Sequence, residues 1–408
     1  MKNRKIRSCR RGGALLALLL LTAVLITGCG TGISDPTKPG TKSNTQPETK
    51  EGTTYDMTQD TTKKEETTTA PQNPTEAKQK GYVIVTDTVK ADGSTDVTKA
   101  LQELIDANPN RTLFFPDGTY LISAPLKTPA DPMYAVSLLL SDFAVIKASH
   151  KWFSGNAMIC LGGKLPANSS AACSNYSLCG GVIDGSGIAS AVSIDSGRET
   201  RIQNIAIKNA LIGIHIKHGA NNGSSDADIS NVSIIGNGTA LSTGILVEGY
   251  DNTITNVRIG NVQVGVRLKA SANMLRNIHP LFYGSYGSYE TSYGFWDEAG
   301  TNWYDFCYSD HFRVGFKLAK NVHSTFTNCF VFWYDDNGAG KNYVATAFEA
   351  DGRFDSTVNG FKAGFRNDRE SCVLKVGENG GTGRLEMMWV TGNSRAASFD
   401  VYRQYLKE

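Results

Sequence analysis

Hydrophobic residues recur along this chain in short runs of alternating apolar and polar positions, which is the pattern of β-strands. The clearest run begins with Asn, continues with Ile or Val, and appears at 204–207, 231–234 and 256–259. A shortened copy follows at 277–279 and a looser one at 328–331. Asn tolerates the left-handed backbone of a sharp corner, so we expect the Asn residues to lie at corners and to hydrogen-bond to one another when the copies stack.

A second run begins with Gly and then alternates in the same way, at 213–216, 244–247, 265–268 and 315–318, with a related copy at 294–296. A third short strand, Thr253-Ile254, precedes Asn256. Three strands in every 21 to 31 residues make one coil of a solenoid, in which each coil stacks on the next. The pattern predicts one elongated all-β domain over 81–408. The alternative, a β-sandwich with Asn spaced by chance, does not explain the repeated order of the runs.

The segments 91–102 and 112–122 carry the most specific signal, and they contain Asp92-Gly93, Asp96, Ala100-Leu101-Gln102 and Phe115-Pro116. They resemble the opening of the pectate-lyase-like and rhamnogalacturonase/epimerase-like β-helix superfamily. The resemblance implies a single-stranded, right-handed parallel β-helix with a short N-terminal capping α-helix. Asp96 is suited to cap that helix, whose apolar face covers the open end of the first coil; this face comprises Ala100, Leu101, Leu104 and Ile105.

The segment 181–187 is similar to an early coil of polygalacturonases, in which Asp184 is a turn residue. The catalytic motifs of polygalacturonases and the calcium-ligand setting of pectate lyases do not occur in matching coils. The resemblance therefore implies a substrate class, polysaccharide, and assigns no catalytic residue.

The first 80 residues have a different character. Six basic residues precede an apolar run over 14–26, as in a secretory signal, and the run ends in Ile26-Thr27-Gly28-Cys29, which resembles the lipobox of bacterial lipoproteins. We therefore expect a signal peptide over 1–28, lipidation of Cys29, and location on the extracellular face of a bacterial membrane. The Thr-, Lys- and Pro-rich stretch 29–80 has almost no large apolar residue and predicts a disordered tether. An ordinary secretory signal with an incidental Cys is the alternative.

The net charge bears on which partners the protein can attract. The formal net charge is +2, and loss of the six basic residues of the signal leaves −4. A mildly acidic chain has no general attraction to nucleic acid. His215, His218, His311 and His323 are isolated in the sequence, so we predict no metal and no cofactor.

Candidate chemistry lies on the strands that begin with Gly, because in related β-helix enzymes this sheet lines the substrate cleft. Alternation sends two columns of side chains outward. The first column comprises Ser193, His215, Leu246, Arg267, Trp296, Lys317 and Glu349. The second comprises Asp195, Lys217, Glu248, Lys269, Glu298, Ala319 and Asp351. The second column alternates in sign, so a purely structural charge ladder is an open alternative for it.

Aromatic side chains beside cations suit a sugar ring that carries a carboxylate. Loop insertions over 277–294 and 328–348 add aromatic residues that flank the same sheet. The predicted substrate-binding residues are Arg267, Lys269, Trp296, Lys317, Trp333, Tyr289 and Tyr293. The predicted catalytic carboxylates are Glu349, Asp335, Asp336, Glu298 and Asp351.

The first hypothesis is a cell-surface enzyme that cleaves an acidic extracellular polysaccharide, as a lyase or a glycoside hydrolase. The second is a non-catalytic glycan-binding module, which accounts equally well for the aromatic residues. A third, a phage-tailspike-like adhesin, is opposed by the signal sequence. The expected partners are a polysaccharide and, through Cys29 alone, the membrane, and the expected state is a monomer or a homotrimer.

Overall fold

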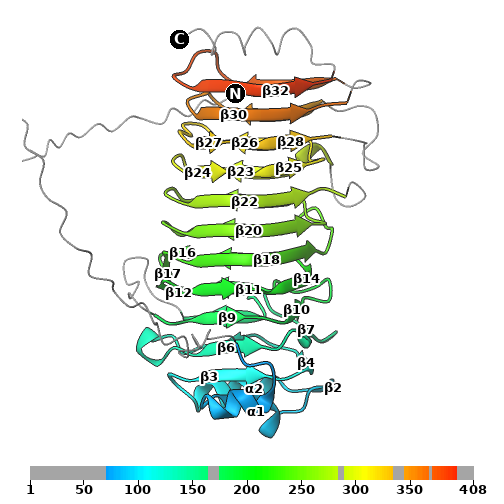
Figure 1. The fold of residues 1–408 in the computed structure, drawn as a ribbon, viewed down its shortest axis with the longest axis vertical. Coiled ribbons are helices and arrows are strands. Elements are labelled where there is room, and N and C mark those ends of the chain that lie inside the picture. Colours follow the sequence, from blue (N-terminus) through cyan, green and yellow to red (C-terminus); the bar gives the residue numbers. More distant parts are fainter. Residues whose placement is uncertain (1–69, 164–173, 284–288, 334–343, 367–369, 393–408) are drawn as a thin grey trace, which may run out of the picture. The chain divides into compact units, whose positions relative to one another are not determined.

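The computed structural model describes residues 70–163, 174–283, 289–333, 344–366 and 370–392. All of them belong to one compact unit, 68–408. Figure 1 shows this unit as a stack of coils whose strands run across the long axis. The parallel β-helix predicted from the sequence is therefore confirmed. None of the helices among the described residues has the length and apolar character needed to cross a membrane.

Sheet A, the larger of the two main sheets in the described part, has 19 strands and covers two sides of each coil. Its strands are β1 (Val83–Ile84), β2 (Asp92–Asp96), β3 (Thr112–Phe115), β4 (Gly118–Ile122), β6 (Ser137–Leu140), β7 (Ala144–Ala148), β9 (Ser177–Cys179), β10 (Val182–Asp184), β13 (Arg201–Gln203), β14 (Ala206–Ala210), β18 (Asp228–Gly236), β20 (Thr253–Gly260), β22 (Met274–Leu281), β24 (Trp303–Asp305), β25 (Tyr308–Asp310), β27 (Thr325–Thr327), β28 (Phe330–Phe332), β30 (Thr357–Gly364) and β32 (Arg384–Thr391).

Sheet B has ten parallel strands within the described ranges and forms the third side of the coils. Its strands are β5 (Leu126–Lys127), β8 (Ile159–Leu161), β11 (Val192–Ile194), β15 (Ile212–Ile216), β19 (Thr243–Val247), β21 (Val264–Leu268), β23 (Tyr293–Asp297), β26 (Val314–Leu318), β29 (Ala345–Ala350) and β31 (Ser371–Val376). A small third sheet holds β12 (Ser196–Arg198), β16 (His218–Gly219) and β17 (Asn222–Ser225). The 3-10 helices of the described residues are η1 (Val85–Asp87), η2 (Pro132–Tyr134) and η4 (Tyr289–Thr291).

The corner of sheet A is made by the repeated Asn, as expected. Asn204, Asn231, Asn256 and Asn277 all have φ between 52° and 55°. From Asn231 onward, each side-chain amide donates to the Asn oxygen of the preceding coil, at 3.1, 3.2 and 2.9 Å along the series. The ladder gives these Asn side chains hydrogen-bond partners, so they do not compete for the backbone hydrogen bonds of the strands. It also fixes how each coil stacks on the next.

Gly at the start of the sheet-B strands is required by close approach between coils. A Cβ atom on Gly265 would lie 2.4 Å from the backbone oxygen of Gly294 and 2.5 Å from Cβ of Pro280. Further along each strand, the inward side chains stack on those of the next coil. Phe295, Phe316 and Phe348 form such a stack, with ring centroids 4.8 and 5.1 Å apart.

The N-terminal end is covered by two helices, α1 (Pro74–Gln79) and α2 (Thr98–Asp106). In α2, Leu101 and Ile105 are fully buried, and the amide of Gln102 exchanges two hydrogen bonds of 2.8 and 2.9 Å with the backbone of Lys127 on the edge strand β5. Helix α2 thus closes the edge of sheet B, as the motif predicted. The carboxylate of Asp96 accepts a 3.0 Å hydrogen bond from the N–H of Thr98, at the start of this helix.

Helix α1 lies within the range 29–80 that the sequence predicts to be a disordered tether. Ala77 is fully buried against Ile84 and Phe114, and Asn73 caps the helix. The predicted boundary between tether and domain at residue 80 is therefore wrong. The short helix was not predicted because it lies in a polar stretch and buries only one residue. Cys29 and the signal segment lie outside the described residues.

Candidate functional site

The register of sheet B brings the first predicted column together. Pairing runs from Ser193 to His215, Leu246, Arg267, Trp296, Lys317 and Glu349, one coil at a time. It continues one coil further, from Glu349 to Lys375. We call the outward side chains of β21, β23, β26, β29 and β31, with the residues that contact them, the sheet-B face.

Trp296 and Arg267 form a stacked pair on the sheet-B face. The guanidinium of Arg267 lies 4.0 Å from the centroid of the indole, and it also donates to Glu298 at 2.8 Å. Tyr293 packs edge-on against the same indole at 5.1 Å. The sequence expectation of an indole between two cations is wrong, because Lys317 turns away from Trp296 to carboxylates of the next coil.

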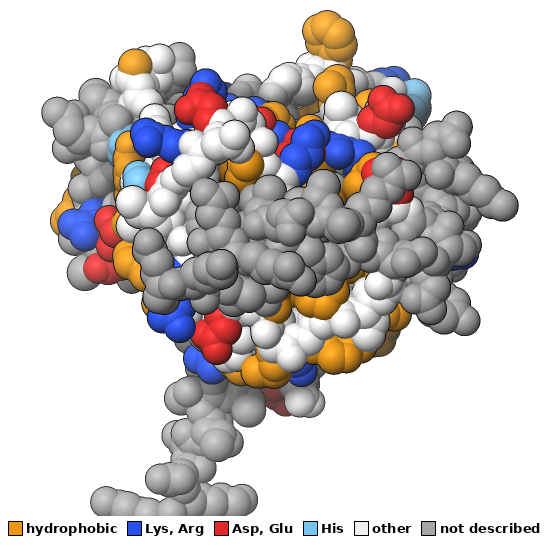
Figure 2. Space-filling model, turned by 90° about the horizontal axis from the view of Figure 1, so that it is seen from above, with side chains coloured by type: hydrophobic (Ala, Val, Ile, Leu, Met, Phe, Trp, Pro, Cys, Tyr) orange, Lys and Arg blue, Asp and Glu red, His pale blue; other side chains and the backbone are white. Residues whose placement is uncertain are grey.

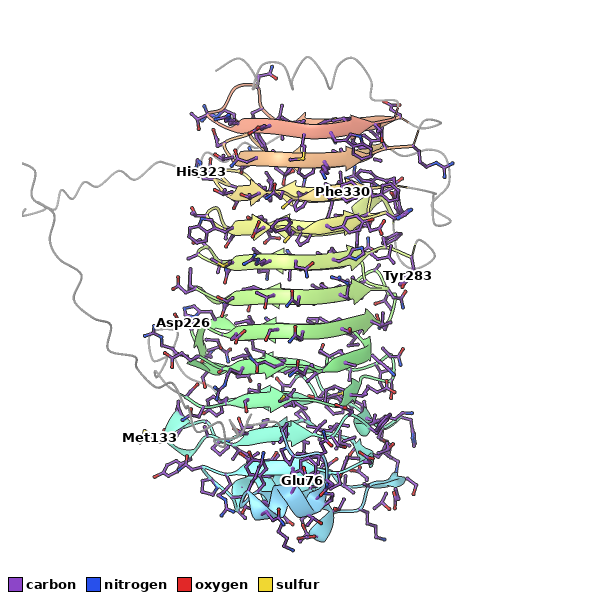
Figure 3. The ribbon with its side chains drawn as sticks, viewed as in Figure 1. Glu76, Met133, Asp226, Tyr283, His323 and Phe330 are labelled. Atoms are coloured by element: carbon purple, nitrogen blue, oxygen red, sulfur yellow. The ribbon has the colours of Figure 1, made fainter. Side chains whose placement is uncertain are left out.

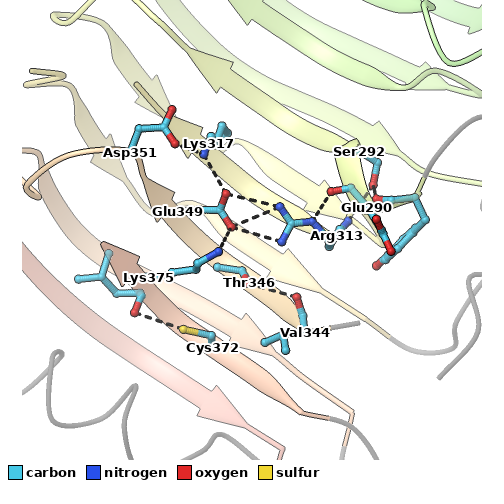
Figure 4. Close-up of polar contacts among 12 residues, drawn as sticks. Glu290, Ser292, Arg313, Lys317, Val344, Thr346, Glu349, Asp351, Cys372 and Lys375 are labelled. Atoms are coloured by element: carbon cyan, nitrogen blue, oxygen red, sulfur yellow. Dashed lines mark hydrogen bonds and ion pairs between the residues drawn. The ribbon is translucent and has the colours of Figure 1, made fainter. Parts of the chain in front are cut away.

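Glu349 is the centre of a cluster of charges (Figure 4). Its carboxylate accepts from Nζ of Lys317 at 2.8 Å, from Nζ of Lys375 at 3.1 Å, and from the guanidinium of Arg313 at 3.3 Å. Lys317 also donates to Asp351. Glu349 and Lys317 are 8% and 7% exposed, so the charges are held in a partly desolvated place where each contact is strong.

The pKa values of this cluster follow from those contacts. Burial raises the pKa of Glu349, but the hydrogen bond from Lys317 and the charges of Arg313 and Lys317 outweigh it and lower the pKa to about 2. Burial lowers the pKa of Lys317, and the hydrogen bonds to Asp351 and Glu349 outweigh it and raise the pKa above its ordinary value. Both groups are therefore charged at neutral pH.

Further down the sheet, charges of opposite sign also pair. Lys217 contacts Asp195 at 2.9 Å, and Glu248 contacts both His215 at 3.0 Å and Lys269 at 3.1 Å. The hydrogen bond from His215 lowers the pKa of Glu248 to about 2, against the effect of burial. Charged side chains of both signs lie beside one another around the rim of the unit (Figure 2). The predicted substrate contact Lys269 is therefore part of an ion-pair ladder, as the structural alternative for the second column proposed.

Two of the aromatic residues predicted to bind substrate lie in the core instead. Trp333 is 3% exposed, stacks on Phe365 at 5.0 Å and donates from its indole nitrogen to the backbone oxygen of Phe312 at 2.7 Å. Tyr289 is 9% exposed and packs edge-on against Phe282. Their predicted role as substrate contacts is wrong, because these side chains pack in the hydrophobic core. Asp335 and Asp336 lie outside the described residues.

Arg313 and Lys375 complete the cluster and were missed in the sequence. Lys375 follows from extending the first column by one coil. Arg313 lies in the turn before β26, where no alternation applies, and its backbone N–H donates to the hydroxyl oxygen of Ser292 at 3.0 Å. Its guanidinium also donates to the backbone oxygen of Glu290, which fixes the direction of the side chain toward Glu349.

A second group missed in the sequence surrounds Asp310 at the end of β25. His311 contacts its carboxylate through Nδ1, and Nε2 of His279 lies 3.4 Å away. The ring of His279 stacks on Tyr308 at 4.1 Å. Burial raises the pKa of Asp310, but hydrogen bonds from His279 and His311 outweigh it and lower the pKa to about 2. Histidines that are isolated in the sequence thus meet at one carboxylate.

Comparison with known proteins agrees with this architecture. The family model for rhamnogalacturonase A/epimerase, pectate lyase-like, matches residues 83–287, and the chain belongs to this family. At the level of the family it is a carbohydrate-active or carbohydrate-binding protein. No curated protein matches the chain.

Comparison with solved structures finds matches at low sequence identity, and two of them, both viral, share the fold. ORF18 of Geobacillus virus E2 is 13% identical, with a TM-score of 0.53 over 78% of this chain and 63% of that one. The gp42 tailspike of Acinetobacter phage vb_AbaP_AS12 is 11% identical, with a TM-score of 0.52 over 77% and 62%. An alginate lyase from Paenibacillus sp. str. FPU-7 is 15% identical, with a TM-score of 0.47 over 77% and 98%. This chain thus spans less than two thirds of the two viral proteins, and the likeness concerns the fold alone.

Proposed function

We propose that this protein binds an acidic polysaccharide on the sheet-B face and cleaves it by β-elimination. The observation that carries the proposal is the charge balance around Glu349. Arg313, Lys317 and Lys375 face two carboxylates, Glu349 and Asp351, so one positive charge is in excess. A uronate carboxylate of the substrate would supply the missing negative charge in a partly desolvated place, where such a pair is strong.

Elimination is favoured over hydrolysis by the state of the carboxylates. A glycosidase needs one protonated carboxyl group to donate to the leaving oxygen. Glu349, with a pKa near 2, is ionised at neutral pH, while Glu298 and Asp351 are engaged by Arg267 and Lys317. A lyase needs cations that stabilise the enolate formed when the proton beside the uronate carboxylate is removed. In this proposal, Arg313 and Lys317 take that role.

The other residues then take supporting roles in the proposal. Trp296, held by Arg267, offers part of its indole to a sugar ring. Glu349 keeps Arg313 and Lys317 in position, so it is a positioning residue. We assign the base that removes the proton to His311, which contacts Asp310 and precedes Arg313 by two residues. The electrons of the broken C–H bond form the C=C bond, and the glycosidic oxygen leaves with the bonding pair.

Lipidation of Cys29 completes the proposal at the level of the cell. It would hold the solenoid on the outer side of the membrane, within reach of extracellular polysaccharide. A Cys29→Ala variant would then be recovered in the culture medium, whereas the native chain would be recovered in the membrane fraction.

The test is product formation from a panel of polysaccharides. The full chain, purified in a neutral detergent, is incubated with polygalacturonate, alginate, hyaluronan and neutral dextran. Reducing ends and the near-ultraviolet absorbance of unsaturated uronate are followed together. We expect both signals to rise with at least one acidic polymer. Reducing ends without that absorbance would contradict elimination and favour a hydrolase.

A non-catalytic glycan-binding module is the second candidate. It is favoured by the ion pairing of every predicted catalytic carboxylate that the structure describes, namely Glu298, Glu349 and Asp351. Retention on an immobilised acidic polysaccharide, with no product from any polymer of the panel, would identify this function.

A further inference from the structure

The Asn ladder of sheet A is interrupted near the C-terminal end of the solenoid. The position that holds Asn277 in one coil holds Phe306 in the next, then Asn328, then Gly360. Phe306 has φ of 51° and is 53% exposed. A bulky residue in the left-handed region has a strained backbone. The phenyl ring of Phe306 is also exposed and so contributes little hydrophobic stabilisation.

The interruption opens a groove of about 780 Å³ on the outer side of sheet A. Phe306 and Met388 form its walls, and both are more than half exposed. Gly360 keeps the floor open, because a Cβ atom there would lie 2.7 Å from Oδ1 of Asn328 and 3.6 Å from Cε of Met388. Trp389, 44% exposed, borders the groove on the last strand, β32.

Polar chemistry is present beside the apolar walls. The side-chain amide of Asn328 and the ammonium of Lys362 both line the groove. In the part of the chain that the structure describes, no ion pair involves Lys362, in contrast to Arg267, Lys317 and Lys375 on the sheet-B face. A cation beside apolar rings and an amide matches a ligand with a flat apolar surface, hydroxyl groups and a negative charge.

We propose that this groove is a second glycan-binding site, which holds an acidic sugar residue of a polysaccharide. Phe306 and Trp389 contact the ring of the sugar, Asn328 binds a hydroxyl group, and Lys362 binds the carboxylate. The concave form and small size of the groove fit one or two sugar residues, whereas a partner protein needs a broader surface.

The groove shares no residue with the sheet-B face. The groove lies over strands of sheet A. Phe330, one of its lining residues, is labelled in Figure 3 on the opposite side of the ribbon from His323. Tyr308 and Phe330 also line the groove, and their rings stack at 4.8 Å. The second site therefore extends the proposed function without depending on cleavage at the first.

The test uses Phe306→Asn, which restores the residue that the ladder has in other coils. Because Asn tolerates the left-handed region, we expect an unchanged or higher unfolding temperature. Retardation of the full chain is measured in native gels that contain polygalacturonate, alginate or neutral dextran. We expect retardation of the native chain by an acidic polymer, and apparent affinity lowered at least about five-fold in Phe306→Asn and in Lys362→Gln.

The remaining outcomes decide against the proposal. Equal retardation of the native chain and Phe306→Asn would overturn it, and so would the absence of retardation in every gel. Equal retardation by dextran would overturn the assignment of an acidic sugar. A native chain that self-associates in sedimentation equilibrium, with a monomeric Phe306→Asn, would identify the groove as a contact between copies. Product formation tests the sheet-B face separately from the groove. If product is lost in Trp296→Ala and retained in Phe306→Asn, cleavage depends on the sheet-B face, whatever the retardation experiment shows for the groove.

Discussion

Replacing Asp297 with Ala is expected to lower the free energy of unfolding by about 3–5 kcal/mol. Asp297 is 1% exposed at the end of β23, and its carboxylate is satisfied entirely by neutral donors. It accepts from the hydroxyl of Tyr304 at 3.0 Å, from Ser324 at 2.6 Å and from the amide of Asn302 at 3.1 Å. Two backbone N–H groups of the following turn also point toward it.

The cost comes from the donors that the substitution leaves behind. Tyr304 is 1% exposed and stacks on Phe326 at 4.4 Å, so its hydroxyl has no route to water. An unsatisfied buried donor costs about 1–3 kcal/mol, and more than one is created. Asp297→Asn keeps an acceptor of the same size and is expected to cost about 1–2 kcal/mol. Denaturant unfolding followed by circular dichroism measures the stability of both variants. Equal stability of Asp297→Ala and the native chain would contradict a stabilising role for the hydrogen bonds to Asp297.

Glu349→Gln is expected to cost about 2–3 kcal/mol near pH 7, and this difference should vanish in acid. The carboxyl has an ordinary pKa of 4.5 and a pKa of about 2 in the folded protein. A lowered pKa contributes stability that is present above the ordinary value and is lost as the pH falls toward the folded value. The native chain should therefore lose stability between about pH 5 and pH 2, and Glu349→Gln should lose less over the same range.

Glu378→Gln is the matched control for this prediction. Glu378 pairs with Lys320 at 2.9 Å, but the two side chains are 52% and 65% exposed. An exposed ion pair contributes little to stability because water and salt screen it. Unfolding temperatures of the three proteins across the pH range provide the measurement. If the unfolding temperature of Glu349→Gln varies with pH in parallel with that of the native chain, the cluster does not hold the carboxylate of Glu349 ionised.

The fold and the register of the site were predictable because both depend on periods. The spacing of Asn and Gly fixes the coil, and alternation within a strand fixes which side chains point outward. These two rules predict that Arg267, Trp296, Lys317 and Glu349 lie in one column, and the strand register confirms it.

The contacts around the site were not predictable, because they are made by residues outside the period. Arg313 reaches Glu349 from a turn, and His279 and His311 come from different coils to the same carboxylate. Tyr289 and Trp333 belong to loops, where nothing in the sequence separates a ring that faces solvent from one that packs beneath its loop.

A second Asn ladder, which is buried, was also missed in the sequence. Asn252 donates to Asn273, and Asn273 donates to Asn302, whose amide reaches Asp297. Each of the three Asn residues lies four positions before the corner residue of its coil, which is Asn256, Asn277 or Phe306, so the period of the coil does mark these positions in the sequence. Their burial is visible only once the coils are stacked.

We propose that the sheet-B face is the primary glycan site, and a pair of tryptophan variants distinguishes this face from sheet A. Trp296 lies on this face, whereas Trp303, 45% exposed, lies on sheet A. The affinity of each variant for the acidic polysaccharide that the native chain binds is measured, with thermal unfolding as a check of folding. We predict at least about a ten-fold loss for Trp296→Ala and less than about a two-fold change for Trp303→Ala. Equal affinities for Trp296→Ala and the native chain, with both proteins folded, would contradict the claim.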